Sequence, residues 1–225
     1  MPIKILIFLS IGTLFMFFPI WAMGKKQNIS AFKCGLISVI LTLVGTLGTM
    51  LMYYIETGSF GGISFFGAVF VVPIVFSLVA IILRAPYGLL LDMCAVGECL
   101  MSAVMKVHCY ISGCCKGRPL FETQNGTVYF PSRMAEMLMA IGLFIILFVW
   151  FKKGKKRNQL YAWYLVLYGS CRFCLNWFRE LPDYTETLLP MGNIWSIVAV
   201  VCGLIWILVA AKNKIDKQYT EINEQ

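Results

Sequence analysis

The stretch SFFGAVFVVPIVFSLVAIIL, residues 64–83, decides the fold class of this chain. It contains no charged residue, and about 20 apolar residues are what an α-helix needs to cross the hydrocarbon core of a bilayer. In lipid every backbone polar group must be hydrogen-bonded within the protein, so an apolar run of this length is helical. We therefore predict that residues 64–83 form a membrane-spanning helix.

Six further apolar runs lie on either side of this one, at residues 3–23, 31–54, 91–111, 134–151, 161–178 and 194–211. The chain is 60% hydrophobic and only 13% charged, which excludes a soluble globular protein and a disordered chain. The first run is too long for a signal peptide, and we interpret it as a retained helix. We predict an all-α, polytopic membrane protein with about seven transmembrane helices. We expect residues 1–225 to form a single integral membrane domain, with 212–225 as a short cytoplasmic tail.

The basic residues predict the topology. They follow the first, third and fifth runs, at Lys25 and Lys26, at Arg84, and over residues 152–157. Because cytoplasmic loops carry the excess of lysine and arginine, the N-terminus is expected outside and the C-terminal tail in the cytoplasm. The long loop at 112–131 then lies on the outer face. The net charge of +8 is a topology signal in this interpretation, and we expect no nucleic acid partner.

Two stripes of polar residues interrupt otherwise apolar runs. The stripe in the fourth run consists of Glu98, Ser102, Lys106 and Cys109, and that in the sixth run of Tyr168, Arg172, Asn176 and Arg179. Spacings of three and four residues place each set on one helix face, so the two stripes are expected to face a shared interior. A charge at the bilayer centre costs about 2.5–3.5 kcal/mol, so each of these charged residues must be paired or face a polar cavity.

Two explanations of the stripes stay open. The charged residues can pair between helices, for example Arg172 with Glu136 or Lys106 with Glu98. Alternatively, the cations hold an anionic ligand, and in a bilayer the abundant anionic ligand is a phospholipid head group. We favour the second explanation, because a guanidinium offers a fork of donors to a phosphate and is always charged.

Six segments resemble the prolipoprotein diacylglyceryl transferases. They are GGISFFG at residues 61–67, GCCKGRP at 113–119, PSRMAE at 131–136, YGSCRF at 168–173, FRELPD at 178–183 and MGNIWS at 191–196, in the order of that family. The resemblance extends from residue 61 to the last apolar run and includes the seven-helix layout. The motif of the sixth run is its most specific part.

The resemblance implies an enzyme that moves the diacylglyceryl group of phosphatidylglycerol to the lipobox cysteine of a preprolipoprotein, forming a thioether and releasing glycerol phosphate. We expect a monomer in the bacterial plasma membrane, with its active site at the outer leaflet and with no cofactor or metal. The implied catalytic residues are Arg172 and Lys106, which hold the phosphate, and Glu136 and His108, one of which handles the proton. The residues assigned to substrate binding are Arg118, Gly113, Gly117, Tyr168, Asn176 and Arg179.

The sequence departs from the family pattern where the thiol would be prepared. Phe66 stands where the family has histidine, Lys106 where it has arginine, and Asn176 where it has glutamate. Cys109 and Cys114 replace an asparagine and a glutamate. The acceptor can therefore be a lipobox cysteine or another thiol. A non-catalytic phospholipid-binding or transport homologue stays open as an alternative.

His108 and three cysteines follow one another closely at the end of the fourth run. His108 can replace the missing base, or it can be an interfacial histidine held by hydrogen bonds. With Cys109, Cys114 and Cys115 it offers a zinc site, a disulfide, a nucleophile or simple packing. The three cysteines also leave open a membrane thiol oxidoreductase. None of these spacings is specific enough to decide among them.

Overall fold

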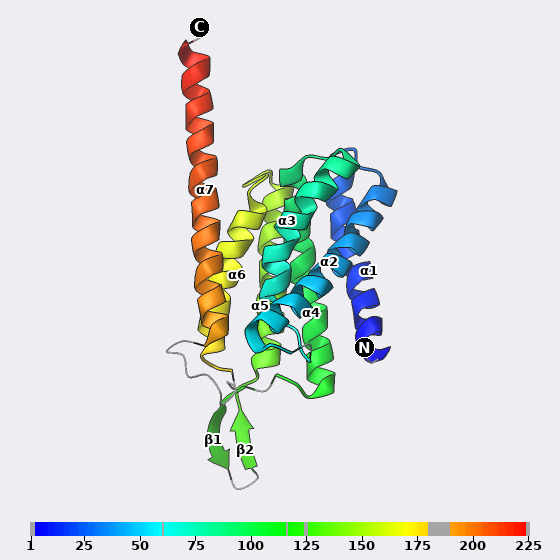
Figure 1. Ribbon diagram of the computed structural model, residues 1–225, viewed down its shortest axis with the longest axis vertical. Coiled ribbons are helices and arrows are strands. Elements are labelled where there is room, and N and C mark those ends of the chain that lie inside the picture. Colours follow the sequence, from blue (N-terminus) through cyan, green and yellow to red (C-terminus); the bar gives the residue numbers. More distant parts are fainter. Residues whose placement is uncertain (1–2, 60, 116, 124–125, 180–189, 224–225) are drawn as a thin grey trace.

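The computed structural model is a bundle of helices with one small β-hairpin at its end (Figure 1). It describes residues 3–59, 61–115, 117–123, 126–179 and 190–223, with side chains up to Lys212. The helices in these ranges are α1 (Ile3–Lys25), α2 (Ala31–Thr57), α3 (Phe66–Leu83), α4 (Tyr87–Ser112), α5 (Ser132–Lys152), α6 (Leu160–Asn176) and α7 (Met191–Asn223). The strands are β1 (Pro119–Thr123) and β2 (Gly126–Tyr129), which pair antiparallel.

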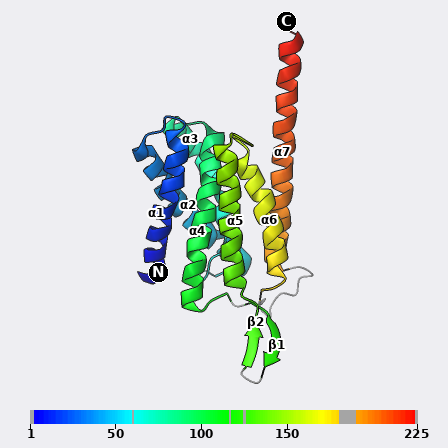
Figure 2. The ribbon, with the colours of Figure 1, turned by 180° about the vertical axis from the view of Figure 1, so that it is seen from behind.

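Helix α4 is the centre of the bundle. It packs against α1 and α5 on either side, as seen in Figure 2, and also contacts α3 and α6. In its most apolar stretch of 18 residues, 72% of the residues are buried, against 44% or less in the other helices of membrane-spanning length. Helix α4 therefore carries its polar stripe through the interior. Helix α2 packs on α3, and α7 packs on α6.

Local chemistry explains several of the helix ends. Ser30 caps α2 through its side chain, which accepts from the Lys33 amide, and Gly58 ends α2 in the left-handed conformation that glycine tolerates best. The start of α6 is held by Asp92 of α4. Its two carboxylate oxygens accept from the backbone amides of Asn158 (2.7 Å) and Leu160 (2.9 Å).

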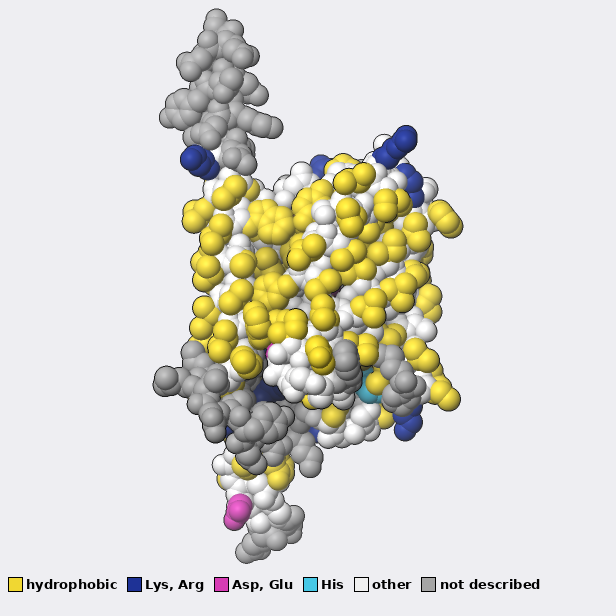
Figure 3. Space-filling model, in the orientation of Figure 1, with side chains coloured by type: hydrophobic (Ala, Val, Ile, Leu, Met, Phe, Trp, Pro, Cys, Tyr) yellow, Lys and Arg dark blue, Asp and Glu magenta, His cyan; other side chains and the backbone are white. Residues whose placement is uncertain are grey.

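The outer surface of the bundle is apolar, as lipid contact requires. Figure 3 shows a continuous belt of hydrophobic side chains over the helices, with basic side chains above and below it. Within the part of the chain that the structure describes, six helices are long and apolar enough to cross a membrane. The all-α prediction is thus confirmed, with helices in all seven predicted places.

Three elements differ from the sequence-based expectation. Helix α6 ends at Asn176 rather than at 178 and, at 17 residues, is shorter than the six helices that could span a bilayer. Its backbone leaves the helix because Arg179 pairs with Gly117 in an isolated β-bridge. Helix α7 continues to Asn223 through the stretch expected as a tail, and the long loop contains the unpredicted hairpin.

The two ends of the bundle differ in charge and in content. The hairpin and the N-terminal end of α1 lie at one end, and the C-terminus lies beyond the other (Figure 1). The basic connections that follow α1, α3 and α5 are at the C-terminal end, as the predicted topology requires. The orientation of the bundle in a membrane stays a prediction.

Candidate functional site

Glu136 of α5 is the focus of three basic side chains. Lys106 of α4 and Arg172 of α6 both form ion pairs with its Oε2 atom. On the other side, Arg179 Nε lies 3.5 Å from Oε1. The Glu136 side chain is only 2% exposed, so this cation cluster, Lys106, Arg172 and Arg179 around Glu136, is an interior feature.

Three packed helices bring the cluster together. Helices α4, α5 and α6 contact one another pairwise, and the two polar stripes face the interface between them. Lys106 is held by α4 at the level where α5 begins, since Glu136 lies just over one turn into α5. The alternative partner Glu98 is not used by Lys106. The Tyr161 hydroxyl instead hydrogen-bonds to Glu98 Oε1 at 3.1 Å.

The cluster has more positive than negative charge. Three cations surround one carboxylate, and Arg172 is 8% exposed. Several buried polar atoms around it have no hydrogen-bond partner among the described residues, including Arg172 Nε and Asn176 Nδ2. Buried polar atoms are normally hydrogen-bonded, and donors such as these could hold a polar, negatively charged ligand.

Asn193 is a buried polar residue that sequence reasoning did not select. It is fully buried near the start of α7, and neither its oxygen nor its nitrogen has a hydrogen-bond partner in the described structure. Its neighbour Gly192 packs against the Asn176 amide, where a Cβ would lie 2.8 Å from Nδ2. The MGNIWS segment at 191–196 was the signal that could have identified it.

Phe66 lies next to the polar stripe of α6. Its ring contacts that of Tyr168 edge to face, with centroids 5.7 Å apart, and Tyr168 is one turn from Arg172. The Phe65 ring is 5.4 Å from the same tyrosine. Phe66, at the position where the resemblance implies a histidine, therefore lies beside the site, but its side chain has no group that could take a proton.

The loop after α4 is tied to the end of α6 by backbone contacts. A Cβ on Gly117 would lie 2.1 Å from the carbonyl oxygen of Phe130, so only glycine fits there. The Arg118 amide donates to the carbonyl of Phe178 (2.9 Å), while the Arg118 side chain is exposed. Gly113 ends α4 with a positive φ, and its carbonyl accepts from Arg133 at 2.8 Å. Lys116 and residues 180–189, including much of the FRELPD segment, lie outside the described residues.

His108 is directed to a different side of α4. Its ring contacts Phe8 of α1 edge to face at 5.2 Å, and its Nε2 atom lies 3.3 Å from Ser112 Oγ. Lys106 faces α5 instead, where it meets Glu136. The structure therefore does not bring His108 to the cation cluster, and the interfacial alternative describes its surroundings better.

The three neighbouring cysteines do come together. The sulfur atoms of Cys109, Cys114 and Cys115 all lie within 4.8 Å of one another, and none forms a disulfide. The hydrogen bond from Cys109 to Cys115 lowers the pKa of Cys115, against the effect of burial, and the charges of Lys106 and Arg179 lower it further, to about 5. We call these residues the thiol cluster. It borders the cation cluster through those two basic residues.

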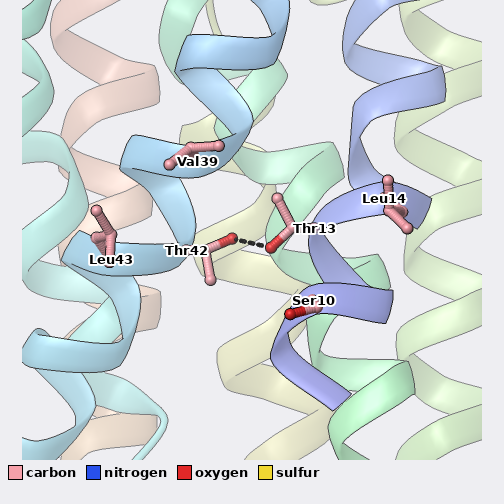
Figure 4. Close-up of a pocket in the computed structure, with 6 residues that line it drawn as sticks. All are labelled: Ser10, Thr13, Leu14, Val39, Thr42 and Leu43. Atoms are coloured by element: carbon pink, nitrogen blue, oxygen red, sulfur yellow. Dashed lines mark hydrogen bonds between the residues drawn. The ribbon is translucent and has the colours of Figure 1, made fainter. Parts of the chain in front are cut away.

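A shallow groove between α1 and α2 is a separate feature. It is lined by Ser10, Thr13, Leu14, Val39, Thr42 and Leu43, with the hydroxyls of Thr13 and Thr42 2.8 Å apart (Figure 4). None of its lining residues is charged. It lacks the chemistry for a phosphate, and we do not assign it to the site.

Comparison with known proteins places these observations in a family. The chain is similar to proteins named phosphatidylglycerol–prolipoprotein diacylglyceryl transferase. In that of Polaromonas naphthalenivorans, 92 residues are 32% identical (39% of this chain, 34% of the relative), and in that of Wolinella succinogenes, 95 residues are 35% identical (40% and 35%). The matched segments thus span about a third of each relative's length. The sequence model of the prolipoprotein diacylglyceryl transferase family, however, matches residues 5–209, nearly the whole chain, and the chain therefore belongs to this family.

Proposed function

We propose that this protein transfers the diacylglyceryl group of phosphatidylglycerol to a cysteine thiol, with the cation cluster holding the lipid phosphate. The observation that carries the proposal is the convergence of Lys106, Arg172 and Arg179 on the single carboxylate of Glu136. The names of the similar proteins give the donor lipid and a prolipoprotein as the acceptor. In this chain the acceptor is a lipobox cysteine or another thiol.

The charge balance favours an anionic ligand over simple pairing. A helix interface that needed only an ion pair would be satisfied by one cation for Glu136, and each additional buried charge costs free energy. Three cations leave a net charge of about two positive units, which a phosphodiester and the growing charge of a leaving phosphate would reduce. Arg172 can offer its unpaired Nε to such an oxygen.

The position of the cluster suits a lipid head group. Glu136 lies near the first residues of α5, and the hairpin follows directly beyond this end of the bundle. If the helices cross a bilayer, this level is close to the interface rather than at the centre of the hydrocarbon. Basic side chains are visible in Figure 3 in the recess between the hydrophobic belt and the hairpin.

The proposed reaction is a displacement at the glyceryl carbon. The thiolate sulfur forms a bond to that carbon, the carbon–oxygen bond to phosphate breaks, and its electron pair leaves on glycerol phosphate. Lys106 and Arg172 stabilise the negative charge that develops on this oxygen. Both Glu136 oxygens face cations, so we assign Glu136 to positioning them.

Complementation tests this function directly. The protein is expressed in cells depleted of the authentic transferase, and mass spectrometry follows the diacylglyceryl modification of a reporter lipoprotein. We expect rescue by the unmodified chain and its loss in Lys106→Met, whereas Lys33→Met, an exposed lysine that donates to the Leu83 carbonyl at the opposite end, retains it. A correctly inserted protein that binds phosphatidylglycerol but gives no modified reporter contradicts transfer to lipoproteins and supports the non-catalytic lipid-binding alternative.

A further inference from the structure

The thiol cluster has the arrangement of a metal site. Cys109 lies in the last turn of α4, and Cys114 and Cys115 follow the Gly113 cap, which turns the chain back on the helix. Their three sulfurs lie within 4.8 Å of one another. Tetrahedral zinc binds sulfur at about 2.3 Å, which sets sulfurs about 3.8 Å apart. Small side-chain rotations would therefore suffice to bind one ion.

The backbone of the cluster is fixed in an unfavourable conformation. Cys115 has φ 56°, a left-handed value that a side chain with a Cβ rarely adopts. It is held there by α5, because the Ser132 hydroxyl donates to the Cys115 carbonyl (2.9 Å) and Arg133 donates to the Gly113 carbonyl (2.8 Å). Strain of this kind persists where the surroundings impose it, and it is common at ligand-binding sites.

Charge and access also suit a metal ion. Three thiolates on a divalent ion leave one negative charge, and Lys106 and Arg179 are close enough to act on the cluster electrostatically. Cys109 is buried, Cys115 half-buried and Cys114 exposed, so the cluster extends from the helix interface to the surface. Among the described residues an ion bound there has three protein ligands, which leaves a fourth position for a further ligand.

We propose that Cys109, Cys114 and Cys115 bind one zinc ion, and that the free fourth position takes the thiol of the acceptor. This inference departs from the expectation of a metal-free enzyme, and its second half rests on the proposed function. It gives the thiol a route to deprotonation that the three residues considered for this role, Phe66, His108 and Glu136, do not offer. Phe66 has no basic group, His108 faces α1, and Glu136 is occupied by cations.

The chemistry balances without a redox partner. A zinc-bound thiol gives up its proton to water, because coordination stabilises the thiolate. The thiolate sulfur then forms the thioether bond to the glyceryl carbon, and the departing electron pair goes to glycerol phosphate, which Lys106 and Arg172 stabilise. Zinc keeps its charge and its three cysteine ligands throughout. The neutral thioether is a weaker ligand than the thiolate, which favours product release.

Metal binding is tested first, independently of transfer. The full-length protein is purified in detergent, its thiols are reduced with a phosphine, and Zn²⁺ is measured by elemental analysis after removal of unbound metal. We expect about one equivalent per chain in the unmodified protein and in Cys202→Ser, which alters an exposed cysteine of α7. Cys115→Ser is expected to lose it. Co²⁺ should give thiolate charge-transfer absorption in the same two proteins that bind zinc.

The outcomes separate the metal site from the proposed function. Reduced, folded protein that binds no Zn²⁺, or equal binding by Cys115→Ser, overturns the metal site, as does a native disulfide between any two of the three cysteines. The disulfide would instead favour a thiol oxidoreductase. If Cys115→Ser does not fold, Cys114→Ser at the exposed position gives the same test. Zinc binding without transfer leaves the metal site standing and contradicts the proposed function. If the protein binds zinc but transfer is unaffected by metal removal, both the metal site and the proposed function stand, and the assignment of the fourth position to the acceptor thiol is contradicted.

The open position is tested with peptides. A lipobox-type peptide containing cysteine is added to the Co²⁺-loaded protein, and a peptide with serine in its place is the matched control. We expect the cysteine peptide alone to increase the charge-transfer absorption, because a fourth sulfur joins the metal. Identical spectra with both peptides would overturn the assignment of the fourth position to the acceptor.

Discussion

Two buried carboxylates, Glu98 and Glu136, are stabilised in opposite ways. Glu98 lies in the middle of α4 and meets the Tyr161 hydroxyl, a neutral partner that also lies 2.9 Å from the Val69 carbonyl oxygen. Glu136 lies near the start of α5 and is surrounded by three cations. The first is a local polar contact between helices, made with a neutral hydroxyl. The second has more charge than its carboxylate can balance, which is expected of a site that binds an anion.

The largest effect on stability should come from neutralising Glu136. In Glu136→Gln three basic groups lose their common counter-ion, and breaking a buried ion pair typically costs about 3–5 kcal/mol. Denaturation in mixed detergents measures the free energy of unfolding. Because the cations then need another anion, added phosphatidylglycerol should restore part of the loss, and a loss below about 1 kcal/mol would contradict the interpretation of Glu136 as the centre of the cluster.

Replacing Arg172 should affect activity most. In Arg172→Gln the phosphate loses a buried guanidinium, and removal of one such donor typically lowers kcat about 10²–10³-fold. Transfer from phosphatidylglycerol to a cysteine peptide, followed by mass spectrometry, gives the rate. Arg157→Gln is the matched control, since Arg157 contacts Gln27 at the opposite end of the bundle. A comparable loss in both variants would show that the effect is general rather than local.

A smaller effect is expected for Asp92, the buried acid that holds the start of α6. Each carboxylate oxygen of Asp92 accepts one backbone amide, that of Asn158 or that of Leu160. In Asp92→Asn one of these oxygens becomes an amide nitrogen, which cannot accept a hydrogen bond. One buried N–H is left without a partner, at a cost of about 1–3 kcal/mol. Thermal unfolding should show the loss, while the affinity for phosphatidylglycerol stays unchanged. Weakened lipid binding would place Asp92 in a functional network instead.

The smallest effect should come from Glu98→Gln. A glutamine can keep the contact with Tyr161 and carries no charge, so we expect a stability change below about 1 kcal/mol and unaltered transfer. The same two assays measure it. A strong loss of transfer with normal stability would break the contrast with Glu136, because it would make the mid-helix carboxylate part of the chemistry.

The sequence was sufficient to predict where the helices lie and which residues share a helix face. Apolar runs of membrane length predict each helix, and the three- and four-residue spacings predict that Lys106 and Arg172 face inward; both contact Glu136 Oε2. Helix ends were less predictable. Helix α6 stops at Asn176 because Arg179 pairs with Gly117, a residue far away in the sequence.

Partner choice could not be predicted, because periodicity fixes a face but not the neighbour that it meets. Lys106 has two acidic candidates, Glu98 about two turns away on α4 and Glu136 on α5, and only the packing of α4 on α5 selects Glu136. Similarly, His108 is two residues from Lys106 and thus points to another side of the helix, toward Phe8. The thiol cluster depends on a left-handed turn at Cys115, which no residue preference indicates.

Direct binding of phosphatidylglycerol tests the central claim that the cation cluster holds a lipid phosphate. The dissociation constant of a short-chain phosphatidylglycerol is measured for the unmodified protein, Arg172→Gln and Arg157→Gln in a neutral detergent. A lost charged hydrogen bond weakens binding by about 1.5–3 kcal/mol, which corresponds to roughly 10–150-fold for Arg172→Gln. Arg157→Gln should bind as the unmodified protein does. Equal dissociation constants for all three proteins would contradict the claim.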